Sequence, residues 1–344
     1  MHQDIKTYNK KTLLEWLEAH GERPFRADQI LKWIYMRLAD GFEQMTDLSK
    51  PFRDLLMAHF VYGRLPVTQI RSADDGTRKF LFGLADGQTV ETVLIPERDH
   101  HTLCISSQVG CAQGCRFCLT GQGGFARNLT VAEIVGQVWE VRKQMADPAR
   151  LTNLVFMGMG EPLANYANLV ETIQILTNSD WGMKFASRRI TVSTAGLVPR
   201  IADLGRDTRV NLAVSFNAVD DESRSQLMPI NRKYPIAQLL AACRHYPLPK
   251  GRKITFEYIL FKDVNDSIAH ARSLAKLLGP VKAKINLIPF NAYPGSAFER
   301  PSEERIQAFQ AYLIDKHFTS MVRYSKGLEI MAACGQLRAE MGSR

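Results

Sequence analysis

The sequence predicts an α/β protein built on a parallel sheet, and two observations carry that prediction. From about residue 102 onward, short apolar runs alternate with amphipathic stretches, six times in succession. Strands that alternate with helices need crossover connections and therefore run parallel. The hydrophobic share of 45% is that of an ordinary folded protein, and no apolar run reaches the roughly 18 residues of a membrane span. The pattern fits either a partial barrel or an open doubly wound sheet.

Each of the six units pairs a strand with a helix. Strands are expected at 102–107, 153–158, 189–194, 210–216, 253–260 and 284–290. Helices are expected at 130–144, 165–178, 198–204, 236–245, 268–278 and 302–317, where apolar residues recur at helical spacing. Unusual residues gather where the strands end: GMGEP at 158–162, then Ser193, then Ser215, Phe216 and Asn217, and finally Asn291. Because the carboxyl ends of parallel strands share one rim, these residues predict a site there.

The first 65 residues predict a helical accessory region. Leu13, Leu14 and Leu17 share one helical face, and Ser49 with Pro51 is typical of a helix start. Lysines and arginines cover the outer faces, which suits either a solvated bundle or a module that docks RNA. Residues 66–97 then change period to strand-like runs at 77–84 and 89–96 with Asp-Gly turns, which predicts a short antiparallel meander.

Glu91 is unusual in this meander. On a strand it shares a face with Val93 and Ile95, both apolar. A carboxylate there lies at the mouth of a site, inside the protein, or at an edge that faces water. The residue pattern alone leaves these alternatives open.

Charge and cysteine content narrow the class of protein. The formal net charge is +9, from 44 basic and 35 acidic residues, which favours an anionic partner such as nucleic acid. Six cysteines in 344 residues are too few for a disulfide scaffold. The amino terminus has no apolar core of a secretory signal. We therefore expect a reducing, cytoplasmic location and no membrane partner.

Three cysteines, Cys111, Cys115 and Cys118, lie within eight residues after the first strand of the array. Thiolates with this spacing can hold three corners of a 4Fe-4S cluster and leave the fourth iron open. The competing reading is a zinc site with Cys104 as the fourth ligand, but zinc usually takes paired C-x2-C knuckles on a small ribbon. A zinc-bound RNA-binding module without catalysis is therefore the alternative of another class.

The C-x3-C-x2-C loop after the first strand resembles the radical S-adenosylmethionine (SAM) enzymes, and GMGEP is similar to their GGEP-type segment. The match is narrower still. TLCISSQVGCAQGCRFCLTGQGGFARNLT, FMGMGEPLAN, VSFNA, NLIPFN and the terminal AACGQL together resemble the RlmN/Cfr adenosine methyltransferases. FRADQILKWIY and MTDLSKPFR are similar to the accessory region of that family. The resemblance covers essentially the whole chain.

The resemblance implies roles for individual residues. Cys111, Cys115 and Cys118 would hold one 4Fe-4S cluster whose open iron binds SAM, with two SAM molecules used per turnover. Cys334 would carry a methyl group, Cys104 would resolve the adduct through a transient disulfide, and Glu91 would accept the proton at adenine carbon 2. The SAM-contacting positions would be Gly160, Glu161, Ser193, Ser215, Phe216, Asn217 and Asn291. Cys243 matches no motif.

The resemblance also implies substrates and architecture. The substrate would be an adenosine of 23S ribosomal RNA met before ribosome assembly, with the tRNA adenosine next to the anticodon as a second target; carbon 8, as in Cfr, is the alternative position. An electron donor such as flavodoxin or ferredoxin would be needed, and we expect a monomer. The implied fold is a partial six-stranded radical SAM barrel at 98–320, preceded by the helical domain (1–65) and the linking meander (66–97). A C-terminal catalytic cysteine loop (321–344) would follow.

Three residues depart from the family pattern. Lys326 stands where arginine is more common, Leu328 where an acidic residue is common, and Asn217 where many members have histidine. The first two bear on how the C-terminal loop docks or meets RNA, and the third on one SAM contact.

Overall fold

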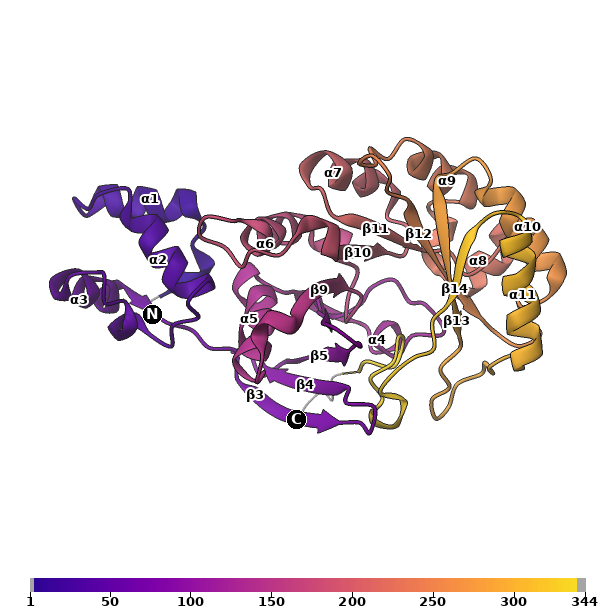
Figure 1. The fold of residues 1–344 in the computed structure, drawn as a ribbon, viewed down its shortest axis with the longest axis horizontal. Coiled ribbons are helices and arrows are strands. Elements are labelled where there is room, and N and C mark those ends of the chain that lie inside the picture. Colours follow the sequence, from indigo (N-terminus) through magenta and orange to yellow (C-terminus); the bar gives the residue numbers. More distant parts are fainter. Residues whose placement is uncertain (1–2, 339–344) are drawn as a thin grey trace.

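The computed structural model describes residues 3–338, and one large sheet dominates it (Figure 1). Within those residues this sheet has ten strands, in the order β14-β13-β12-β11-β10-β9-β6-β5-β4-β3. Its parallel part consists of β6 (His101–Cys104), β9 (Leu151–Phe156), β10 (Ile190–Thr194), β11 (Asn211–Ser215), β12 (Ile254–Leu260), β13 (Ala283–Pro289) and β14 (Thr319–Val322). The six predicted strands are confirmed. The seventh, β14, extends the array beyond the prediction, because its four residues are partly exposed and lack a strong apolar run.

Helices cover the outside of this sheet. They are α5 (Val131–Lys143), α6 (Tyr166–Thr177), α7 (Val198–Asp207), α8 (Asp221–Leu227), α9 (Ile236–Arg244), α10 (Ile268–Leu278) and α11 (Glu303–Asp315). Six of them match predicted helices to within a few residues. Thr130 begins α5 with a capping box to Glu133, and Ser302 caps α11, so side-chain oxygens take up the free amides of the first turns. The described strands β3 and β14 remain unpaired edges, so the barrel is partial.

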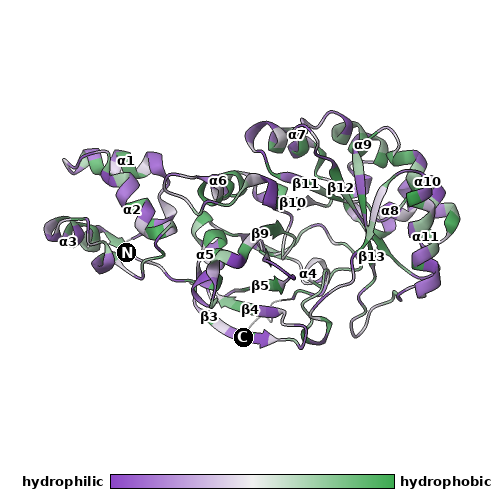
Figure 2. Cartoon of the chain, in the orientation of Figure 1, coloured by the Kyte–Doolittle hydropathy of each residue, from purple (hydrophilic) through white to green (hydrophobic). Residues whose placement is uncertain are grey.

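The meander belongs to the same sheet. Strands β3 (Val67–Ser72), β4 (Arg78–Gly83) and β5 (Thr89–Pro96) pair in antiparallel fashion, and β5 pairs with β6 so that Val93 lies opposite Cys104. The edge strand β3 is hydrophilic and largely exposed (Figure 2), which is how natural sheets discourage edge-to-edge association. The meander therefore continues the barrel wall toward the start of the chain.

The amino-terminal helices form a separate lobe to one side of the sheet (Figure 1). They are α1 (Lys10–Ala19), α2 (Arg26–Tyr35) and α3 (Lys50–His59), tied by the short parallel pair β1 (Gln3–Asp4) and β2 (Phe60–Val61). Smaller elements are α4 (Leu119–Gln122), β7 (Gln108–Gly110), β8 (Phe125–Asn128), and the 3-10 helices Ile5–Thr7, Phe42–Gln44, Pro148–Arg150, Pro162–Asn165, Ser187–Arg189, Pro229–Arg232 and Leu328–Ile330. Among the described residues, no helix combines the length and apolarity required to cross a bilayer.

Helix α5 joins the lobe to the barrel. The indole of Trp139 donates a hydrogen bond to the Ile34 carbonyl at 2.9 Å. Arg64 donates hydrogen bonds to the buried Glu140 carboxylate from Nε at 2.7 Å and from Nη2 at 2.8 Å. The Leu65 amide donates to the same carboxylate at 3.2 Å. Two-pronged guanidinium–carboxylate pairs fix orientation as well as distance, so this junction holds the lobe in one pose.

We expect Glu140→Ala to lower the free energy of unfolding by about 2 kcal/mol, because three hydrogen bonds to a buried carboxylate are lost together. The control is Asp40→Asn, which removes ion pairs with the same Arg64 at 2.9 Å and with Lys143 at 2.8 Å, but between side chains that are 31% to 43% exposed; it should cost less than about 1 kcal/mol. Urea titration followed by tryptophan fluorescence measures both. Equal losses of stability in the two variants would contradict the claim that the Glu140 hydrogen bonds stabilise the contact between lobe and barrel.

Candidate active site

The cysteine loop lies just beyond the end of β6. A hairpin of β7 and β8 frames it, with the Cys111 amide donating to the Gly124 carbonyl at 2.7 Å. Gly110 has a φ of +72°, and a Cβ there would meet that same carbonyl oxygen at 2.0 Å. Gly110 therefore permits a close backbone crossing that brings Cys111, Cys115 and Cys118 onto one tight turn.

The three thiols suit an iron–sulfur cluster in donor type and surroundings. Burial raises the pKa of Cys111 to about 12, and burial together with the neighbouring Cys118 and Cys111 thiols raises that of Cys115. Such thiols ionise when a metal binds them. An apolar cluster packs against the loop: Phe117, Ala218, Leu227, Met228, Phe261, Phe290 and Tyr293. This shell limits the access of water to the thiols.

A single zinc ion would need its ligands to converge within about 2.3 Å of one point. In residues 3–338, no group of three or more His, Cys, Asp or Glu side chains is arranged to hold one metal ion. A 4Fe-4S cluster makes a different demand, because each thiolate binds its own iron. The three cysteines supply the thiolate donors that such a cluster takes, and the cluster would supply reductive electron transfer when bound.

The GMGEP segment after β9 packs tightly against Gln108, the first residue of β7, which leads into the cysteine loop. Gly160 has a φ of +103°, and a Cβ there would lie 2.6 Å from the Cβ of Gln108 and 2.8 Å from its amide nitrogen. The Gln108 side chain in turn accepts a hydrogen bond from the Glu161 amide at 2.8 Å. Glycine at position 160 therefore allows the close approach to Gln108 that fixes the position of the Glu161 backbone.

Glu161 is a buried carboxylate held by backbone amides. Its oxygens accept from Ala195 at 2.7 Å and from Leu163 at 3.0 Å, and 2% of the residue is exposed. Burial raises its pKa to about 7, although these hydrogen bonds act in the opposite direction. A carboxyl group that titrates near neutrality at the rim can receive a cationic amine.

The other predicted SAM-contacting residues lie on the same rim. Ser193 is near the end of β10 and Ser215 ends β11, both half-buried, while Phe216 is fully buried directly after it. Asn217 has a φ of +58°, and its amide is already engaged: Oδ1 accepts from the Ile259 amide at 2.8 Å and Nδ2 contacts the Met228 sulfur at 3.3 Å. Asn217 therefore ties β11 to β12, a role that the sequence did not suggest.

A buried arginine links these strand ends by hydrogen bonds. Arg224 has no exposed surface, and it donates to the carbonyls of Ala195, Ser215 and Phe216 at 2.8, 3.0 and 3.1 Å and to the Asn231 side chain at 2.9 Å. Burial lowers its pKa to about 10. Sequence reasoning missed Arg224, because it lies in the hydrophilic helix α8, where an arginine is typically solvated.

The structure brings Cys104 and Cys334 to the same region from opposite ends of the barrel domain. Cys104 ends β6 and is buried; burial raises its pKa, and the nearby Cys334 thiol raises it further. Cys334 is an exposed residue, yet enough protein surrounds its thiol for burial, then Glu257 and Cys118, to raise its pKa to about 11. All six cysteines are free thiols.

Residues 326–338, here called the Cys334 segment, are held against the cysteine loop by contacts to their backbone. The Leu119 amide donates to the Gly335 carbonyl at 2.8 Å, and the Asn291 side chain donates to the Cys334 carbonyl at 3.3 Å. Lys326 bonds the Pro96 carbonyl and lies 3.3 Å from Glu97, which anchors the segment to the end of β5. Leu328 is 46% exposed, so this departure from the acidic residue that is common in the family places an apolar side chain on the surface.

Glu91 is buried and points at this segment. One carboxylate oxygen pairs with Lys79 Nζ at 2.8 Å, and the other accepts from the Arg338 amide at 2.9 Å. Lys79 also donates to the Met331 carbonyl at 3.2 Å. Of the alternatives that the sequence left open for Glu91, the interior position is the one observed, while its cationic partner Lys79 was not foreseen.

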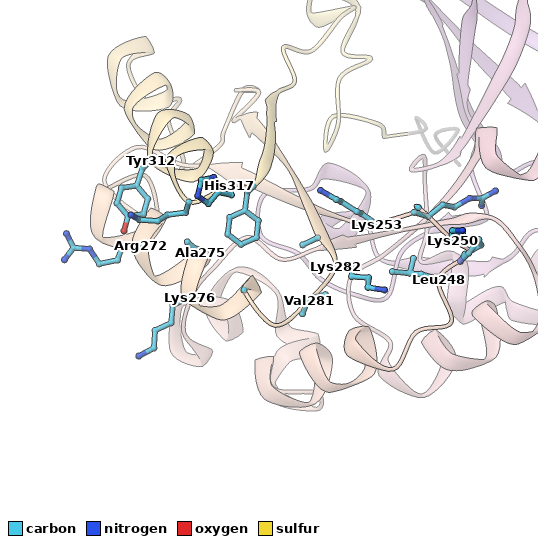
Figure 3. A pocket seen from close by; sticks show the side chains of 17 residues that line it. Leu248, Lys250, Lys253, Arg272, Ala275, Lys276, Val281, Lys282, Tyr312 and His317 are labelled. Atoms are coloured by element: carbon cyan, nitrogen blue, oxygen red, sulfur yellow. The ribbon is translucent and has the colours of Figure 1, made fainter.

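One well-defined cavity does not coincide with these residues. A cavity of about 820 Å³ lies at the opposite end of the strands, before β12, β13 and β14 (Figure 3). It is rich in basic side chains: Lys250, Arg252, Lys253, Arg272, Lys276, Lys282, Lys316 and His317. Of these, only Lys316 has an ion pair among the described residues. This end of the barrel therefore concentrates positive charge away from the cysteines.

A thiol loop with three donors on the carboxyl rim of a partial βα barrel defines a radical SAM enzyme. Residues 105–275 match the radical SAM superfamily model, and residues 3–61 match the ribosomal RNA large subunit methyltransferase N-terminal domain. The chain is 54% identical to the dual-specificity RNA methyltransferase RlmN of Desulfosudis oleivorans, over 98% of this chain and 91% of the relative. It is 53% identical to the protein of that name from Geobacter sulfurreducens, over 98% and 92%.

Structural comparison agrees. The fold superposes on a radical SAM methyltransferase from Sphaerobacter thermophilus with a TM-score of 0.92 and 47% identity, over 98% of this chain and 100% of the other. The chain belongs to the RlmN family of radical SAM RNA methyltransferases.

Gly160→Ala should lower the free energy of unfolding by about 3 kcal/mol and weaken SAM binding, because the new methyl group collides with Gln108 and displaces Glu161. Gly87→Ala is the matched control: its φ of +80° carries a similar backbone cost, but nothing lies within 4 Å of the added Cβ. It should cost about 1 kcal/mol. Urea unfolding and SAM titration of the anaerobic protein compare the two, and indistinguishable variants would argue against the tight packing.

Proposed function

We propose that this enzyme methylates carbon 2 of an adenosine in 23S ribosomal RNA and of the tRNA adenosine next to the anticodon. The observation that carries the proposal is the placement of Cys334. Its segment lies on the cysteine loop, its thiol is near Cys104, and Arg338, four residues on, contacts Glu91. The three residues that we propose as carrier, resolving thiol and base therefore lie around one rim.

The cofactors, when bound, supply a methyl group and a radical that can remove a hydrogen atom. Cys111, Cys115 and Cys118 would hold the cluster, and Glu161 with the strand-end residues would hold SAM. Cys334 Sγ accepts the methyl group and then presents the activated carbon to the base. Adenine carbon 2 is electron-poor and cannot displace a methyl group by itself, so the carrier thiol provides the reactive carbon.

Two residues of the chain complete the reaction. Glu91, held by Lys79 and the Arg338 amide, accepts the proton that leaves carbon 2, and the cluster, when bound, would take back the one unpaired electron of the adduct. The Cys104 thiolate attacks Cys334 Sγ, so a sulfur–sulfur bond forms as the sulfur–carbon bond breaks, and the released carbon takes up a proton as the methyl group. Two electrons from a thiol reductant then restore both cysteines. Two SAM molecules are consumed per turnover.

The partners follow from this chemistry. A stacked adenosine has to be splayed into the pocket, which favours ribosomal RNA before assembly and the exposed tRNA loop. The +9 charge and the unpaired cations of the 820 Å³ cavity favour a polyanion. We infer a cytoplasmic monomer that takes electrons from a flavodoxin or ferredoxin. Mass mapping of the modified adenosine distinguishes carbon 2 from carbon 8.

Cys334→Ala should abolish RNA methylation while iron content and SAM cleavage persist, because only the carbon carrier is lost. Cys104→Ala should instead accumulate RNA joined covalently to the protein, because the adduct on Cys334 is not resolved. Cys243→Ala, a buried thiol on α9, is the control and should methylate normally. Denaturing gels with labelled RNA and product mass analysis measure these outcomes; methylation at the wild-type rate by Cys334→Ala would exclude the mechanism.

SAM affinity should depend on pH through Glu161. Its folded pKa of about 7 lies above the usual 4.5, so burial of this carboxyl stabilises the free protein at low pH, and that contribution fades as the pH rises from 4.5 through 7. The ionised form suits the amino group of SAM, so affinity should fall about tenfold per pH unit below 7 and level off above it. Calorimetric SAM titrations from pH 6 to 8.5 test this. Glu161→Gln should flatten the profile, and a flat wild-type profile would refute the assignment.

A further inference from the structure

Two polar residues face each other inside the barrel wall without a role in the chemistry above. Glu257 on β12 lies in register with Asn286 on β13, and each is 8% exposed. Asn286 Nδ2 donates to Glu257 Oε1 at 3.0 Å. The other amide atom, Asn286 Oδ1, is buried and has no hydrogen-bond partner. A buried acceptor left without a donor costs stability, so its retention requires an explanation.

Strand alternation places this pair on the inner face of the barrel. Tyr258, the next residue along β12, packs against Phe309 of α11 with ring centroids 5.5 Å apart, so it faces the outer helices. Glu257 therefore faces the other way. Its charge contributes to the raised pKa of Cys334, so the pair lies near the proposed carbon carrier.

Glu257 can act as donor or acceptor near neutral pH. Burial raises its pKa to about 7, while the Asn286 hydrogen bond and the charges of Arg323 and Lys284 act in the opposite direction. Together the pair offers a free amide oxygen and a carboxyl group of adjustable protonation. Nucleobases are read through such edge-on donors and acceptors once they leave the stack.

We propose that Asn286 and Glu257 form the recognition site for the edge of the target purine, with Asn286 Oδ1 accepting a hydrogen bond from the exocyclic amine of adenine. This inference rests on the proposed function, and it names the group that selects the base. Guanine presents a carbonyl oxygen where adenine presents the amine. Two acceptors would then oppose each other in a site shielded from water, so guanine is rejected.

The test combines a residue change with a substrate change. One RNA hairpin is prepared with adenosine at the target position, and a second with purine riboside, which keeps the hydrogen on carbon 2 but lacks the amine. Wild-type enzyme should prefer adenosine by at least about tenfold in kcat/KM, the ratio that corresponds to one hydrogen bond of about 1.4 kcal/mol. Asn286→Ala should bring that ratio close to one.

Ser320→Ala is the matched control. Ser320 Oγ is also buried and unpartnered, but Ser320 pairs with Ile285 and so lies on the opposite face of the sheet from Asn286. This variant should keep the wild-type ratio. An unchanged ratio in Asn286→Ala would overturn the inference, as would loss of SAM cleavage without RNA in that variant. Absence of methylation of both hairpins by wild-type enzyme would instead refute the proposed function.

Discussion

The docking of the Cys334 segment across the rim is the constraint on which the rest of the site depends. The other candidate residues lie on strands or on the loops that directly follow strands, whose positions the sheet sets. Cys334 lies beyond the last strand, so only local contacts place it. Backbone bonds to Leu119 and Glu91, together with the Lys79 bond to Met331, supply that placement. Because the contacts to Leu119 and Glu91 are made by backbone atoms of the segment, its conformation rather than its side chains determines where the thiol lies.

Buried charge gives the rim its rigidity. Arg224 binds three carbonyls at the ends of two strands, and Glu161 binds two amides on neighbouring loops. Each group would be costly to bury alone, and each is offset by several hydrogen bonds from the backbone. The two charges have opposite sign and serve the same rim, so the strand ends and the GMGEP turn are fixed before a ligand arrives.

The sequence predicted the central strands because buried parallel strands produce continuous apolar runs. It missed β14, an edge strand of four residues, and α8, whose sequence DESRSQL looks like a solvated turn. The cysteine loop could be noticed in the sequence because three thiols lie within eight residues, and the resemblance to radical SAM enzymes supplied the expected chemistry. The structural roles of Arg224 and Lys79 could not be predicted, because they depend on burial of the side chains, which a single sequence does not reveal. Asn286 and Glu257 did leave a signal, as isolated polar residues in the runs KINLIPF and KITFEYIL.

That signal is the same one that drew attention to Glu91, and its physical basis is general. A polar side chain inside a strand that is apolar on both sides loses its hydration on folding. Where the fold provides a full set of partners, as for Asn217, the residue is structural. Where one atom stays unpartnered, as in Asn286, the missing partner has to come from outside the chain or the cost remains uncompensated. If the thiols on this rim react as proposed, an adenine base beside Cys334 would supply the hydrogen-bond donor that Asn286 lacks.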